Sequence, residues 1–159
     1  FEHNLVDILT LVKLLIHMEK IITNKIQGRI DNFGLGIYLE KNERKDAVKH
    51  IITAFDNGNI KAGIYLGNYY KKNKDWNNAI KVWYRLKEKG IEYAYIELAK
   101  YFEHRRKEPE TALDFMIELK DLQNKKGSLL RWSLKENARN VYDNIYKRIN
   151  RLENKIKKN

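Results

Sequence analysis

The sequence contains no cysteine, one proline and eight glycines in 159 residues. Without cysteine the chain has no disulfide framework, no thiolate metal site and no cysteine nucleophile. Proline and glycine interrupt helices, so their scarcity favours long helical segments. Strictly alternating runs of β-branched residues, which would indicate strands, are also missing. We therefore predict an all-α protein.

Long apolar runs are missing as well. A membrane-spanning helix needs about 18 consecutive apolar residues, and the most apolar stretch, residues 5–18, is interrupted by Asp7, Thr10, Lys13 and His17. The start has neither the basic leader nor the small-residue cleavage site of a secretory signal. We expect a cytoplasmic protein with no membrane partner. Because the chain opens with Phe1, we interpret it as a fragment of a larger protein.

A short motif recurs at intervals of 31 and 32 residues. The motif consists of a leucine, a small residue directly after it and a large apolar residue three positions later. Its three copies are Leu35-Gly36-x-x-Leu39, Leu66-Gly67-x-x-Tyr70 and Leu98-Ala99-x-x-Phe102. Each copy is followed by an alanine and, one helical turn later, a large residue, in the pairs Ala47/Ile51, Ala79/Trp83 and Ala112/Met116. Small residues let two helices cross closely, and large ones fill the space beside them. A period near 32 is typical of stacked helix pairs.

Over residues 30–125 this pattern resembles the tetratricopeptide repeat, although the first-helix tryptophan and the closing proline of that repeat are absent. The resemblance implies a right-handed superhelix of stacked helix pairs, an α-solenoid. We divide the chain into an apolar N-terminal helix (1–27), three helix pairs (28–127) and a basic capping helix (128–159). The first helices of such arrays line a concave binding face, which here would contain Asn68, Lys71, Lys72, Lys100, Glu103 and His104.

The two flanking helices differ in character. Residues 5–22 are apolar on nearly all sides, so we expect them to be buried by a missing domain or by a second copy of the chain in a homodimer. Residues 128–159 hold nine basic and three acidic residues, which is +6 of the net charge of +11. The predicted basic surface comprises Arg105, Arg106, Arg139, Lys147, Arg148, Arg151 and Lys155. This surface would suit nucleic acid or an acidic partner. The alternative is that it is a solvated helix face without a partner.

The N-terminal segment His3-Asn4-Leu5-Val6-Asp7-Ile8-Leu9-x-Leu11-Val12 resembles the last catalytic helix of RNase H-like 3′–5′ exonucleases. The run from Ala94 to Arg105 and the terminal Arg148-x-x-Arg151-Leu152-x-x-x-Ile156 resemble the region after the nuclease domain in bacterial exonucleases of the YprB-like family. The resemblance implies Asp7 as a metal ligand, with His3 placing the attacking water. Such a site needs about four carboxylates around two divalent ions. We therefore expect this chain to be non-catalytic, with metal cofactors only in an intact parent.

The leading expectation is a binding module that recruits a protein partner or nucleic acid beside a nuclease domain. The alternatives are the retained end of a metal-dependent exonuclease and a scaffold without a nucleic-acid role. Aromatic residues interleaved with cations can stack bases, or they can be packed between helices. The residues of this kind are Trp76, Trp83, Tyr84, Arg85, Arg131 and Trp132.

Overall fold

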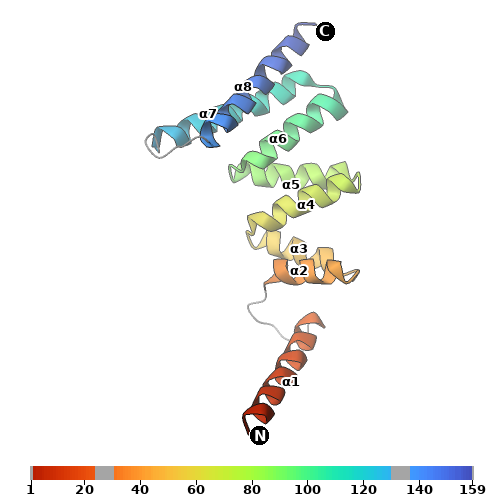
Figure 1. Cartoon of the computed structure of the whole chain (residues 1–159). Helices are drawn as coiled ribbons and strands as arrows, with labels where there is room; N and C mark the ends of the chain where they lie inside the picture. Colours follow the sequence, from red (N-terminus) through yellow and green to blue (C-terminus); the bar gives the residue numbers. More distant parts are fainter. Residues whose placement is uncertain (1, 24–30, 130–136, 159) are drawn as a thin grey trace. The chain divides into compact units, whose positions relative to one another are not determined.

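A computed structural model describes residues 2–23, 31–129 and 137–158, with side chains described except at 2, 3, 22, 126–129 and 137–143. These parts of the chain are all helical (Figure 1), which confirms the predicted class. The helices are α1 (Glu2–Ile22), α2 (Asn32–Lys41), α3 (Ala47–Asp56), α4 (Ile60–Lys72), α5 (Trp76–Glu88), α6 (Glu92–Tyr101), the π-helical turn η1 (Phe102–Arg106), α7 (Pro109–Leu129) and α8 (Asn137–Ile156). Consecutive helices pack as antiparallel pairs. None of the described helices is long and apolar enough to cross a membrane.

The chain divides into two compact units, Phe1–Ala62 and Gly63–Asn159. In the first unit, α2 packs against α3. Asp31 caps α2 by accepting hydrogen bonds from the amides of Phe33 and Gly34, at 3.1 and 3.0 Å. A Cβ atom on Gly36 would lie 2.4 Å from Ile51 Cγ1. The close approach that the motif predicts between these two helices is therefore present.

In the second unit, α4 and α5 meet in the same way. A Cβ atom on Gly67 would lie 2.6 Å from the Trp83 indole nitrogen, and Trp83 is only 1% exposed. The other predicted crossing residues, Ala79, Ala99 and Ala112, are also buried. α6 then packs against α5 and α7, and α8 packs against α7. Most of the predicted core positions are therefore buried in all three helix pairs, whereas Leu35, Tyr70 and Phe102 are half-buried.

Capping residues and glycines mark the loops between these helices. Asp75 caps α5 by accepting a hydrogen bond from the Asn78 amide at 3.2 Å. Pro109 begins α7, where its missing N–H leaves no bond unmade. Gly58 and Gly90, between the pairs, have φ values of 91° and 67°, which favour glycine.

The last helix is predicted to start at about Ser128. In the structure α7 is described as far as Leu129 and α8 from Asn137, and residues 130–136 lie outside the described residues. In addition, α6 continues into η1, which closes at Lys107 in the left-handed conformation (φ 59°). The segment division at residues 27 and 127 stays a prediction.

Candidate anion-binding groove

Two buried carboxylates organise the charged side chains of the second unit. The first is Glu97 on α6, whose side chain is 7% exposed. Its Oε2 accepts a hydrogen bond from Lys71 Nζ of α4 at 2.5 Å, and its Oε1 accepts one from Lys100 Nζ at 2.7 Å. Burial by itself would raise the pKa of Glu97, but the hydrogen bonds and charges of the two lysines outweigh it and hold the pKa below its ordinary value. Glu97 is therefore a fixed anion that positions two cations.

The second carboxylate, Glu103, lies in η1 with its side chain 3% exposed. Arg151 Nη2 donates to its Oε2 at 2.5 Å, and Lys155 Nζ lies 3.5 Å from its Oε1. His104 Nε2 is 3.5 Å from Oε2. Because Arg151 and Lys155 both belong to α8, the Glu103 carboxylate ties that helix to the end of α6.

Arg148 lies on α8 near both carboxylates. Burial lowers its pKa, the charge of Arg151 lowers it further, and Glu103 and Glu97 act in the opposite direction. Its Nη1 atom is buried and has no hydrogen-bond acceptor in the described part of the chain. Glu97 and Glu103 are already bound by other cations. Arg148 is therefore a guanidinium group with unused hydrogen-bonding capacity.

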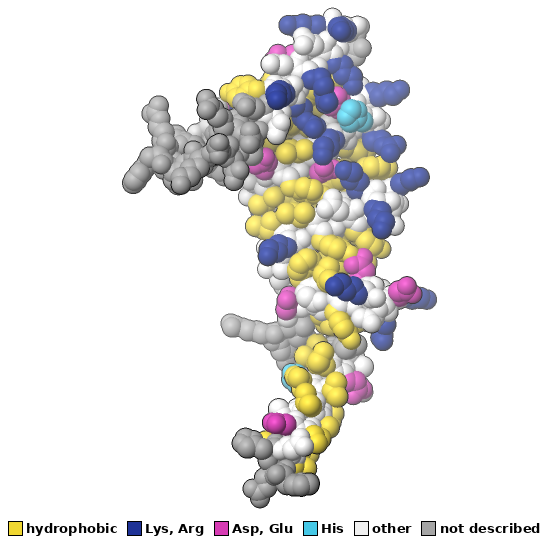
Figure 2. Space-filling model, in the orientation of Figure 1, with side chains coloured by type: hydrophobic (Ala, Val, Ile, Leu, Met, Phe, Trp, Pro, Cys, Tyr) yellow, Lys and Arg dark blue, Asp and Glu magenta, His cyan; other side chains and the backbone are white. Residues whose placement is uncertain are grey.

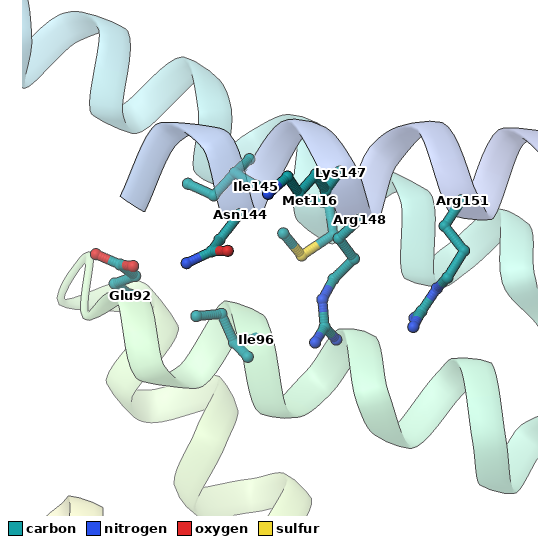
Figure 3. Close-up of a pocket in the computed structure, with 8 residues that line it drawn as sticks. All are labelled: Glu92, Ile96, Met116, Asn144, Ile145, Lys147, Arg148 and Arg151. Atoms are coloured by element: carbon teal, nitrogen blue, oxygen red, sulfur yellow. The ribbon is translucent and has the colours of Figure 1, made fainter. Parts of the chain in front are cut away.

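Three cavities adjoin these groups. One of about 430 Å³ lies between α6 and α8, where Arg148 and Arg151 project from α8 toward α6 (Figure 3). A second, of about 650 Å³, follows α8 from Lys147 to Lys158 and includes Glu103. A third, of about 310 Å³, lies on the α4 side of Arg148. Arg148 lines the first and third, and Arg151 lines the first and second, so we treat them as one basic groove.

The basic groove comprises Lys71, Lys100, Arg148, Arg151 and Lys155, with Lys147 and Lys158 at its α8 end. The first five cations surround Glu97 and Glu103, which leaves these seven groups with a net charge of +3, and a third carboxylate, Glu92, lines the first cavity. Lysine and arginine side chains gather over the α6–α8 part of the unit (Figure 2). The groove thus presents an excess of positive charge.

The third cavity has an aromatic wall beside its cations. The rings of Trp76 and Tyr101 are 5.7 Å apart, and those of Trp83 and Tyr101 are 6.4 Å apart. The guanidinium of Arg105 lies 4.8 Å from the centre of the Trp76 ring. Trp83 is buried, which agrees with its predicted packing beside Ala79 and favours packing over base stacking for this residue, whereas Trp76 and Tyr101 remain partly accessible. Only part of the predicted aromatic set can therefore contact a ligand.

The structure brings most of the predicted site residues together. Lys71, Lys100, His104, Arg105 and Arg148 line the 310 Å³ cavity, and Glu103, Lys147, Arg151 and Lys155 line the cavity along α8. Glu103 was predicted as a contact residue, but it is buried and acts by holding cations. Glu97, the other organising carboxylate, was not predicted. The equivalent positions of the earlier repeats are Gly34 and Tyr65, so the repeat pattern carried no signal for it.

Other predicted residues lie apart from the groove lining. Asn68 accepts a hydrogen bond from the Tyr93 hydroxyl at 2.8 Å, and burial raises the pKa of Tyr93 to about 12. Lys72 is exposed at the end of α4. Arg106 pairs with Glu108 at 3.2 Å. The side chains of Arg139 and His3 lie outside the described set, as do Arg131 and Trp132.

Asp7 lies exposed on α1, as do the apolar side chains from Leu5 to Met18 (Figure 2). Among the described residues, no group of three or more histidine and carboxylate side chains is placed to hold a metal ion. The proposed role of Asp7 as a metal ligand stays a prediction that depends on residues of another domain.

Comparison with protein-family models, with curated proteins and with solved structures finds no match to this chain. The resemblances to tetratricopeptide repeats and to RNase H-like exonucleases therefore rest on sequence patterns alone.

Proposed function

We propose that this chain is a non-catalytic, helical-repeat binding module that recruits nucleic acid through the basic groove, next to a nuclease domain in its parent protein. The observation that carries the proposal is Arg148, whose buried Nη1 has no acceptor in the described residues while both nearby carboxylates are bound by other cations. A buried donor left unpaired costs about 1–3 kcal/mol. An anion in the groove would supply the missing acceptor.

The arrangement of charges on α8 suits a polyanion. Arg148, Arg151 and Lys155 follow one another at steps of three and four residues, so they share one face of α8, and Lys158 follows in the turn after the helix. At 1.5 Å per residue, Arg148 to Lys155 span about 10 Å of the helix axis, and Lys158 extends the stripe beyond the end of the helix. One strand of B-form DNA has a phosphate about every 3.4 Å along the helix axis, and the phosphates of an extended strand are farther apart. The stripe of cations therefore reaches about three or four phosphates.

The helical-repeat part of the proposal concerns the arrangement of the pairs. We expect α2–α3, α4–α5 and α6–α7 to stack with a constant right-handed rotation, with α8 covering the last apolar face. The buried small residues at each crossing support this arrangement, since equivalent crossings give equivalent stacking. Small-angle X-ray scattering tests it: an elongated particle is expected, and a profile of a compact sphere would contradict it.

Fluorescence anisotropy with labelled single-stranded and duplex DNA and RNA tests the recruitment role. The expected result is micromolar binding at physiological salt that weakens when Lys147 and Lys158 are both changed to glutamine. A matched control carries Lys61→Gln and Lys81→Gln, two exposed lysines outside the groove lining. Equal weakening in both double variants would mean that net charge, and not the groove, attracts nucleic acid. Binding to none of the four ligands would leave the scaffold role as the better account.

A further inference from the structure

The 310 Å³ cavity, at the α4 side of the groove, is lined by both cationic and aromatic side chains. The described residues that line the other two cavities include cations but no aromatic residue. Its cations are Lys71, Lys100 and Arg148, and its aromatic wall is Trp76 and Tyr101. Lys71 and Lys100 are held in place by the buried Glu97 carboxylate. The cavity is therefore a pocket with a charged end and an aromatic side.

From this pairing we infer that the cavity receives one nucleotide of a single-stranded nucleic acid, with the phosphate on Arg148 and the base against Trp76 and Tyr101. The inference rests on the proposed recruitment of nucleic acid and names the part of the strand that is recognised. A guanidinium group can bind a phosphate through two N–H donors, and Arg148 has a buried N–H donor without a described acceptor. Stacking of a base on an aromatic side chain adds to the affinity without requiring a particular base.

The pocket favours a single strand over a duplex. Arg148 is half-buried between α8 and α6, so a phosphate must enter the groove to reach it. In a duplex the bases are stacked inside the helix and are not free to meet the aromatic wall. In an unpaired strand each phosphate is followed by a base that can turn toward Trp76.

The pocket also favours a nucleotide over an acidic peptide. Carboxylates could bind Arg148 and the lysines, but an acidic side chain places no planar ring against Trp76 and Tyr101. The Arg105 guanidinium lies over one face of the Trp76 ring and adds a cation beside this wall. A ligand that carries an anion and a ring in every unit uses both ends of the pocket.

Binding of a labelled ten-nucleotide thymidine strand to the whole chain tests the inference. Arg148→Gln is expected to weaken binding about tenfold or more, because a charge-assisted hydrogen bond is lost. Lys81→Gln, an exposed site on α5 that removes the same charge, should weaken it less than threefold. Arg148→Lys should restore part of the affinity. Thermal unfolding of each variant, followed by circular dichroism, should show that the fold is retained.

Comparison with two ligands of matched charge, an abasic strand and an acidic peptide, shows whether the base is recognised as well as the negative charge. An abasic ten-residue strand should bind at least about fivefold more weakly than the thymidine strand, since stacking is lost. In the Trp76→Leu variant this difference should shrink. Equal affinity of the two strands, or equal competition by a peptide of ten glutamates, would overturn the nucleotide assignment. Equal losses in Arg148→Gln and Lys81→Gln, with strand binding retained, would overturn the pocket but leave the recruitment role intact.

Discussion

Arg151 Nη2 lies 2.5 Å from Glu103 Oε2 and links α8 to the π-helical turn η1 across 48 residues of sequence. The carboxylate is 3% exposed, whereas the arginine is 53% exposed. Glu103 is therefore the buried anchor of the pair, and Arg151 reaches it from the surface. This contact fixes the face of α8 that carries Arg148, so the shape of the groove depends on it.

Replacing Glu103 by glutamine should lower the free energy of unfolding by about 1–3 kcal/mol, because charge-assisted hydrogen bonds to Arg151 and the attraction of Lys155 are lost. Urea denaturation measures the change. Glu153→Gln, an exposed site on the same α8 helix, should change the free energy by no more than about 0.5 kcal/mol. Equal values for the two variants would mean that Glu103 does not anchor α8.

The stability contributed by Glu97 should depend on pH. Its pKa is lower in the folded protein than its ordinary value of 4.5, which the unfolded chain should approach. The stabilisation is therefore complete above about pH 4.5 and is lost as the pH falls through the lower, folded-state pKa. The difference in unfolding free energy between the wild type and Glu97→Gln should be larger at pH 7 than at pH 3. A difference that is the same at both pH values would contradict the role of Lys71 and Lys100.

The helix crossing in the first unit should be sensitive to one methyl group. Gly36→Ala gains about 1 kcal/mol of helix propensity, but the new Cβ meets Ile51 Cγ1 at 2.4 Å and the Ala47 carbonyl oxygen at 3.1 Å. Overpacking costs about 1–3 kcal/mol, so we expect a net loss of roughly 1 kcal/mol. In an Ile51→Ala background the same change should be less costly. Additive effects in this double-mutant cycle, measured by urea denaturation, would show that the two residues do not crowd each other.

We also expect the chain to form homodimers through residues 5–22. Leu9, Val12 and Ile16 are each about half exposed on α1, and burying apolar surface contributes about 25 cal/mol per Å². Sedimentation equilibrium should show a dimer at high protein concentration, and Leu9→Asp should abolish it. Lys13→Gln, on the same helix, should leave it unchanged. A wild type that stays monomeric throughout would exclude this contact.

The sequence predicted the helix pairs well because their crossings are local and chemically distinctive. Gly36 and Gly67 stand where a side chain would collide with Ile51 or Trp83, and this requirement is visible in the repeat. The cations of the groove other than Lys158 were also predicted, since lysine and arginine on the helices are visible in the sequence. The role of the carboxylates as anchors was not predicted, because Glu97 and Glu103 meet cations 26 and 48 residues away. The π-helical turn η1, which leaves Glu103 buried and His104 exposed, has no compositional signature.

The salt dependence of binding tests the central claim most directly, namely that the groove binds the phosphates of a nucleic acid. Fluorescence anisotropy of the whole chain with a labelled single strand should be repeated from low to physiological salt. Contact with three or four phosphates predicts a slope of about −2 to −3 in a plot of the logarithm of the binding constant against the logarithm of the salt concentration. It also predicts micromolar binding at physiological salt. A slope near zero, or binding that is lost above low salt, would contradict the account.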